Sequence, residues 1–322
     1  MRFHLSLLTI SMLCVGTSAM AQSSVTLYGR INTSIERQKT ADTAKWAEVD
    51  NNSRFGFRGT EDLGGGANAG FALESGFASD TGVSGGGTTF FNRRSELFLG
   101  KKNLGTLRLG RWTSDAYFAT ADVVGLHNHD TGSSSDLLYA GFQRTNNTIG
   151  FRTPEIIPGL EATAAVGLGE RVNPNLRDFS VTYRTGGLSL GLGYNNFLSA
   201  TSIAKNDKAS QVAVRALYNI GAFTVGGYYQ RDRDARANGD RDNLRLAAMY
   251  ATGPWEFHLN AGVAGNTGDV AQSGARQYTV ATNYNLSKRT KVYAFATRLD
   301  DKAARLYGGD TSSVAVGVRH NF

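Results

Sequence analysis

The sequence predicts an all-β protein, a 16-stranded antiparallel transmembrane β-barrel whose strands are joined by short turns on one side and long loops on the other. Three observations support this prediction. Apolar and polar residues alternate with period two along most of the chain, the alternating segments run about nine to twelve residues, and short turns alternate with long polar segments. A tilted strand of about nine to eleven residues crosses a bilayer. A sheet in lipid must close, because an open edge leaves unpaired backbone groups in hydrocarbon.

The composition excludes two other classes of protein. The chain has 322 residues with 39 Gly, 4 Pro and 1 Cys, and its mean hydropathy is negative. After the first fifteen residues no run of about 20 apolar residues occurs, so a helical membrane protein is excluded. A single cysteine cannot build a disulfide framework.

The N-terminus resembles a secretory signal. Arg2 gives a basic start, residues 5–15 are mostly apolar, and residues 19–21 read Ala-Met-Ala, a small-x-small cleavage pattern. We therefore predict a signal peptide over residues 1–21 and a barrel over residues 22–322. A buried N-terminal helix is the alternative.

The first predicted strand shows the pattern most clearly. One face carries the apolar residues Val25, Leu27, Ile31 and Ile35. The other face carries the polar or amphipathic residues Thr26, Tyr28, Arg30, Asn32, Ser34 and Glu36. The same alternation returns at residues 179–183, 188–194, 211–218, 244–250 and 313–322. Each strand is thus expected to have an apolar and a polar side.

The connections between strands set their number. Seven short turns are predicted at residues 61–66, 103–106, 154–159, 185–187, 219–222, 252–254 and 286–290. Eight long polar loops are predicted at residues 38–50, 78–89, 114–140, 170–176, 199–208, 232–241, 266–274 and 300–311. Together they separate sixteen strands, and no Pro interrupts any of these strands, as ladder hydrogen bonding requires.

Aromatic residues recur beside the short turns. They precede or follow a turn, or end the chain, at Tyr183, Tyr218, Tyr250, Tyr284, Phe223, Trp255, Tyr293 and Phe322. Aromatic rings favour the headgroup level of a bilayer, so we interpret them as an interfacial girdle. Random aromatic decoration of strands is the alternative.

Sixteen strands leave a water-filled lumen, whereas about eight would be filled by side chains. Period two places small or polar residues inside at Gly191, Gly193, Thr224, Gly226, Asn260, Asn283 and Gly317. It also places arginines inside at Arg30, Arg58, Arg94, Arg152, Arg184, Arg215, Arg245 and Arg319. Charged rings set pore selectivity, so this wall predicts a preference for anions. About half of these arginines are expected to pair with acids or turn carbonyls.

Residues 114–140 form the longest predicted loop, with acids at Asp115, Asp122, Asp130 and Asp136. A loop this long is functional or disordered. We predict that it folds into the lumen and sets its acids against wall arginines. The resulting transverse field would orient dipolar solutes and admit small hydrophilic ones.

Several segments resemble one protein family. They are residues 24–30, 53–66, 91–95, 105–111, 286–290 and 317–322, and they include the Glu-Asp-Leu-Gly-Gly-Gly run and the terminal Arg-His-Asn-Phe. In these segments the chain resembles the trimeric 16-stranded general diffusion porins of Gram-negative β-proteobacteria, such as those of Burkholderia, Comamonas and Neisseria. The resemblance covers essentially the whole predicted mature chain.

The resemblance implies a homotrimer in the outer membrane of a Gram-negative bacterium, surrounded by outer-membrane lipid and lipopolysaccharide, with the third loop folded into each pore. It also implies a basic constriction wall, which by motif position comprises Arg54, Arg93, Arg94 and Arg144. Period two adds Arg30 and Arg58. Arg93 and Arg94 cannot both face inward in a regular strand, and the third loop departs from the family pattern. Its acids are therefore not matched to particular arginines.

The expected function is passive diffusion of small hydrophilic or anionic solutes, without a cofactor. An outer-membrane barrel enzyme of the protease or phospholipase type is one alternative, but His127, His129, His258 and His320 lie in no nucleophile motif. A substrate-specific porin is another, and its aromatic track would need more than the scattered Tyr28, Phe98 and Tyr228.

Two further motifs are assigned non-catalytic roles. His127, His129 and Asp130 could form half of a metal site, but no further ligand has suitable spacing, so no metal is expected. Residues 231–236 alternate in charge, as a solvated loop does, or could bind lipopolysaccharide phosphates through cations. A nucleic-acid partner is not expected for a secreted barrel.

Overall fold

The computed structural model describes residues 24–125, 127, 131–139, 144–170, 175–198, 208–236 and 239–322. The predicted signal peptide, residues 1–21, lies outside the described residues and stays a prediction. The first half of the sheet comprises β1 Ser24–Thr40, β2 Thr43–Asp50, β3 Arg54–Gly64, β4 Ala67–Gly76, β5 Arg94–Lys101, β6 Gly105–Thr113, β7 Arg144–Arg152 and β8 Leu160–Gly167. The second half comprises β9 Leu176–Thr185, β10 Leu188–Leu198, β11 Lys208–Ile220, β12 Phe223–Arg236, β13 Gly239–Thr252, β14 Trp255–Ala264, β15 Ala275–Asn285, β16 Thr290–Asp301 and β17 Thr311–Asn321.

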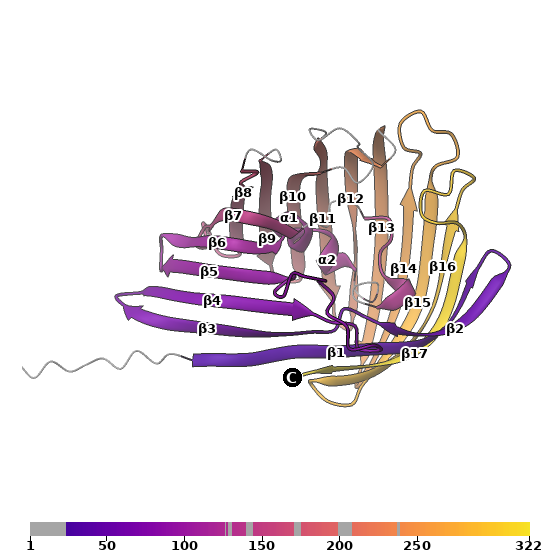
Figure 1. Ribbon diagram of the computed structural model, residues 1–322, viewed down its shortest axis with the longest axis horizontal. Coiled ribbons are helices and arrows are strands. Elements are labelled where there is room, and N and C mark those ends of the chain that lie inside the picture. The colour runs from indigo at the N-terminus through magenta and orange to yellow at the C-terminus, as the bar shows by residue number, and fades with distance from the viewer. Residues whose placement is uncertain are drawn as a thin grey trace, which may run out of the picture.

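The strands form one closed antiparallel sheet, in which β1 pairs with the C-terminal strand β17 (Figure 1). The other edge of β1 pairs with β2 through residues 33–40 and with β3 through residues 24–30. β2 and β3 therefore act as one wall strand that is interrupted at residues 51–53, where Asn52 has a φ of 61°. The described residues thus form sixteen barrel strands from seventeen segments, which confirms the predicted fold class.

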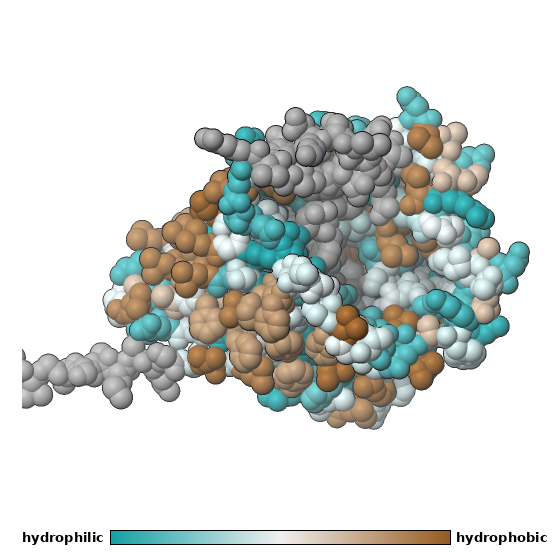
Figure 2. All heavy atoms as spheres, viewed as in Figure 1, coloured by the Kyte–Doolittle hydropathy of each residue, from teal (hydrophilic) through white to brown (hydrophobic). Residues whose placement is uncertain are grey.

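Burial alternates along the strands with the polar side inward. In β1, Ile35 is 56% exposed on the outer face, whereas its neighbour Glu36 is 0% exposed on the inner face. Figure 2 shows apolar residues gathered over the outer surface of the strands at the left of the view. This arrangement, polar inside and apolar outside, suits a wall with water within and hydrocarbon without.

All seven predicted short turns connect neighbouring strands. Two predicted long loops are wrong, because residues 38–50 and 232–241 lie largely in strand hairpins. The β1–β2 ladder continues to the Thr40–Thr43 pair, and the β12–β13 ladder resumes at the Arg236–Gly239 pair after a register shift. Cross-strand pairs such as Arg231 with Asp242, 3.2 Å apart, support these ladders despite their polar composition.

Most of the predicted aromatic girdle lies on the outer face, where Trp255 and Tyr284 have ring centroids 4.7 Å apart. Tyr293 is an exception, and its assignment to the girdle is wrong. Its side chain is 6% exposed and lies inside the barrel, where Asn51 Nδ2 donates to its hydroxyl at 2.7 Å and the hydroxyl donates to Asn32 Oδ1 at 2.9 Å. Strand register sets which face a side chain occupies, so proximity to a turn alone does not place it outside.

The connection between β6 and β7 contains the helices α1 Asp115–Ala119 and α2 Ala121–Val124 and the 3₁₀ turn η1 Gly132–Ser134. Figure 1 shows α1 and α2 against the inner side of the wall. Among the described residues, no helix has the length and hydrophobicity of a transmembrane helix.

Candidate functional site

The third loop is here called the inner loop (residues 114–139), and its described residues, 114–125, 127 and 131–139, lie inside the barrel. Its first helix, α1, contacts β9 and β10, and α2 contacts β11, β12 and β13. η1 reaches β1, β16 and β17. The inward fold predicted for this loop is therefore present in its described residues.

Two glycines of β10 make room for α1. A Cβ built on Gly193 would lie 2.7 Å from the Ala116 carbonyl oxygen, and one on Gly191 would overlap the Ala119 carbonyl oxygen. Period-two alternation placed both glycines inward as small lining residues. Their structural consequence is that the helix backbone can lie directly on the wall.

An ion-pair network fixes the start of the inner loop. Arg108 Nη1 lies 2.8 Å from Asp115 Oδ2, and Arg108 Nε lies 2.7 Å from Glu96 Oε1. Arg94 Nη2 also reaches Glu96, at 2.6 Å. Sequence reasoning missed Arg108, although its position between the outward Leu107 and Leu109 would have placed it inside.

A second network fixes the later part of the loop. Asp136 accepts hydrogen bonds from Arg245 Nε at 2.8 Å and Nη2 at 2.7 Å, and the Tyr228 hydroxyl donates to it as well. Gln277 Nε2 donates to the Ser135 carbonyl at 2.8 Å. Side chains of β12, β13 and β15 thus hold this segment.

The η1 turn is held by a buried carboxylate on β1. Glu36 accepts from the Ser133 backbone N–H at 3.3 Å and from the hydroxyl of Ser313 at 3.0 Å. A Cβ on Gly132 would overlap Glu36 Oε1, so only glycine lets the turn approach this closely. Sequence reasoning placed Glu36 inside but gave it no role.

The structure shows which wall arginines two of the loop acids meet, and the transverse field stays a prediction. Asp115 and Asp136 lie inside the barrel as expected, but each forms a direct ion pair with a wall arginine, so they anchor the loop. Their charges are largely compensated where they lie. Asp122 is half-buried in α2, and Asp130 lies outside the described residues.

The structure brings the motif-matched arginines together on one part of the wall. Arg144, at the start of β7, lies within electrostatic reach of Arg54, Arg93 and Arg111. Arg54 Nη1 donates to the Asn52 carbonyl at 3.1 Å. We call Arg54, Arg93, Arg111 and Arg144 the arginine cluster. Sequence reasoning missed Arg111 because a register shift between Gly110 and Trp112 breaks period two just there.

An acid on the neighbouring strand β4 contacts this cluster. Glu74 Oε1 on β4 lies 2.5 Å from Arg93 Nε. Arg93 precedes β5, so it is not bound by the alternation within that strand. Arg94, the first residue of β5, pairs with Glu74 in register and contacts Glu96 with its side chain. Both arginines therefore reach the inner face, and the conflict noted in the sequence disappears.

The remaining two predicted wall arginines lie near the barrel seam. Arg30 of β1 pairs with Arg54 in register, and its Nε donates to Asn321 Oδ1 at 3.0 Å. The Arg58 guanidinium lies 5.1 Å from the centre of the Tyr28 ring. These two arginines continue the basic wall beside the cluster.

The histidine motif of the inner loop, for which no metal is expected, is described only at His127. His127 of the inner loop is buried, and its ring centroid lies 5.2 Å from that of His258. Burial, reinforced by the nearby His258, lowers the pKa of His127 to about 3. His129 and Asp130 lie outside the described residues, among which no group of three or more potential ligands could hold a metal ion.

Comparisons with known proteins agree with this architecture. A family model described as Gram-negative porin matches residues 8–304. Outer membrane porin protein 32 of Delftia acidovorans is 30% identical over 366 aligned positions, covering 98% of this chain and 99% of that protein. An outer membrane porin of Bordetella pertussis is 25% identical, covering 95% of this chain and 96% of its own length.

Solved structures give the same result. The anion-selective porin from Comamonas acidovorans superposes with a TM-score of 0.77 at 26% identity, covering 94% of this chain and 100% of that one. Salmonella typhi OmpF, at 16% identity and a TM-score of 0.73, shares the fold. The structure is a closed sixteen-stranded barrel with a polar lumen, and the porin family model matches most of the chain. The chain therefore belongs to the Gram-negative porin family and forms a channel in the outer membrane.

Proposed function

We propose that this porin passes small hydrophilic solutes by passive diffusion with a preference for anions, and that the arginine cluster sets this preference. The observation that carries the proposal is a charge imbalance. Four arginines lie together with Glu74 in contact, while Asp115 and Asp136 of the inner loop are occupied in ion pairs elsewhere. A wall with this excess of positive charge attracts mobile anions.

The expected preference is moderate and depends on salt. In water, one unit charge about 8 Å from a passing ion contributes roughly 0.5 kcal/mol, which is about a twofold change in permeability ratio. At about 0.1 M salt the screening length is roughly 10 Å, so the cluster acts mainly on ions that pass close to it. Selectivity should therefore weaken as ionic strength rises.

The relatives support parts of this proposal. The Comamonas acidovorans protein is described as an anion-selective porin. OmpT of Vibrio cholerae, which shares the fold, is described as a trimer form. We propose a homotrimer here too, with outer-membrane lipid and lipopolysaccharide around it. Because its relatives are porins rather than enzymes, we propose no catalytic activity.

A substrate-specific porin is less well supported. A binding track needs aromatic rings that line open water, and Tyr228 is instead buried beneath the inner loop against Tyr139. The Tyr228 ring therefore cannot contact a solute that passes through the lumen.

The proposal is tested by the triple variant Arg54→Ser, Arg93→Ser, Arg144→Ser, reconstituted in a planar bilayer under a salt gradient. Each lost charge should lower the anion-over-cation permeability ratio about twofold. Arg152→Ser is the matched control, because Arg152 ends β7 on the inner face, eight positions along the strand from Arg144. An unchanged permeability ratio in the triple variant would remove the cluster from the selectivity site.

A further inference from the structure

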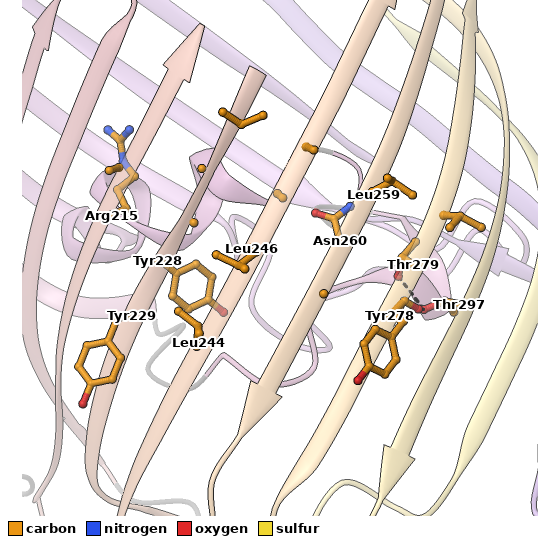
Figure 3. Close-up of a pocket in the computed structure, with 18 of the residues that line it drawn as sticks. Arg215, Tyr228, Tyr229, Leu244, Leu246, Leu259, Asn260, Tyr278, Thr279 and Thr297 are labelled. Carbon is orange, nitrogen blue, oxygen red and sulfur yellow. Dashed lines mark hydrogen bonds between the residues drawn. The ribbon is translucent and has the colours of Figure 1, made fainter. Parts of the chain in front are cut away.

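The outer wall carries a hollow that the channel function does not use. It spans β11 to β16, has a volume of about 1110 Å³, and is lined almost entirely by apolar atoms (Figure 3). Its floor consists of small residues on neighbouring strands: Ala216, Gly227, Ala248, Ala261 and Ala296. Larger side chains, among them Leu244, Leu259 and Val280, form its margins.

The hollow faces hydrocarbon. Leu259, at its margin, is 59% exposed, whereas the next residue, Asn260, is buried inside the barrel. Leu246 and Arg245 show the same alternation on β13. Since outward residues of a barrel wall meet lipid, the natural occupant of this space is an acyl chain.

A basic margin lies at the long-loop end of the hollow. Tyr278 of β15 pairs with Arg298 of β16, and both line the hollow. Arg276 pairs with Asp300 one step further out, so Arg276 and Arg298 are diagonal neighbours, roughly 7–8 Å apart at their backbones. A phosphate fits between two guanidinium groups at this spacing.

The arginines of this basic margin have hydrogen-bond donors that face solvent. The Arg298 side chain is 68% exposed and lies 3.9 Å from Asp300, a long contact that leaves most of its N–H groups facing solvent. Across the hollow, Arg231 lies 3.0 Å from Asp240 and 3.2 Å from Asp242. Arginine and carboxylate side by side at the headgroup level suit phosphates and the divalent cations that bridge them.

We propose that this surface binds one phosphorylated, acylated lipid of the outer leaflet, with a phosphate between Arg276 and Arg298 and an acyl chain in the hollow. The proposal rests on the lipid and lipopolysaccharide surroundings proposed above and assigns them a defined site. Two features favour this occupant over a second copy of the chain. The basic margin is complementary to phosphate, and the long-loop end of the strands is where the outer leaflet lies.

The test uses the full-length refolded protein in detergent with bisphosphorylated, hexa-acylated lipid A as the probe, and native mass spectrometry to count bound lipid. Arg276→Ser with Arg298→Ser should weaken binding at least about tenfold, because charge-assisted hydrogen bonds are lost. Ala248→Phe with Ala261→Phe should also weaken it by filling the hollow. Dephosphorylated lipid A should bind the wild type as weakly as bisphosphorylated lipid A binds the double arginine variant.

Matched controls lie on another part of the outer wall. Arg177→Ser on β9 and Ala164→Phe on β8 make the same chemical changes at exposed positions away from the hollow. Binding that is unchanged in both double variants, or reduced equally by the controls, overturns the proposal. Loss of the oligomer in the hollow-filling variant, with lipid count unchanged, would assign the surface to a second copy instead. Ion selectivity recorded on the same samples tests the channel proposal separately.

Discussion

The contact between Asp136 and Arg245 holds the inner loop, and Asp136→Ala should release it. The Arg245 side chain is 1% exposed and receives its counter-charge from Asp136 at 2.7 Å. Removing one partner of a buried ion pair typically costs about 3–5 kcal/mol, because the other charge stays buried without compensation.

That cost can be compared with what else holds the same segment. Arg241 Nη2 and Asn243 Nδ2 donate to the Leu138 carbonyl at 2.9 and 3.0 Å, and Gln277 Nε2 donates to the Ser135 carbonyl. The Leu137 N–H also donates to Gln277 Oε1 at 3.2 Å, and Gln211 Nε2 donates to the Tyr139 hydroxyl at 2.6 Å. Each such bond contributes about 1 kcal/mol net, so the five together are comparable to the loss and do not exceed it. In Asp136→Ala this segment of the inner loop should therefore be held only marginally against the barrel wall.

Single-channel recording in a planar bilayer measures this directly. The Asp136→Ala channel should show a larger mean conductance with frequent transitions between open levels, and a lower unfolding temperature. The double variant Asp136→Leu, Arg245→Leu should recover much of the stability, since replacing both charges avoids the buried unpaired one. Wild-type conductance and stability in Asp136→Ala would refute the assignment of this pair as the loop anchor.

Two further predictions concern the same loop. Gly193→Leu should displace α1, because even a Cβ would lie 2.7 Å from the Ala116 carbonyl oxygen. Thermal unfolding should show a lower midpoint, and single-channel recording should show an altered conductance. An unchanged midpoint and conductance would contradict the close approach of α1 to the wall. Burial lowers the pKa of His127 to about 3, below the unfolded value of about 6.5. The folded loop thus binds fewer protons, and its stability should be full above pH 6.5 and fall toward pH 3. His127→Gln should flatten that slope in thermal unfolding, and an equal slope in both proteins would contradict it.

Much of the architecture follows from period two alone. Alternation identifies the wall strands, the short turns and the polar interior, because lipid on one side and water on the other impose one pattern along the whole chain. It fails where another constraint sets the side-chain direction. Tyr293 follows a turn but faces inward by register, and Arg111 lies within the register shift between Gly110 and Trp112.

The candidate site was less accessible to sequence reasoning. The composition of the loop predicts that it carries acids, but the arginine that each acid meets depends on contacts between residues far apart in the chain. Asp115 with Arg108 and Asp136 with Arg245 are such cases. Polar residues at 38–50 and 232–241 similarly suggest loops, although cross-strand pairing extends the strands through them.

The most direct test of the account is the zero-current potential of the wild-type channel in a planar bilayer that separates two concentrations of potassium chloride. The arginine-rich wall predicts a zero-current potential whose sign shows that chloride passes faster than potassium. The magnitude of this potential should fall as both salt concentrations rise. A potential of the opposite sign would contradict the charge argument while leaving the barrel in place.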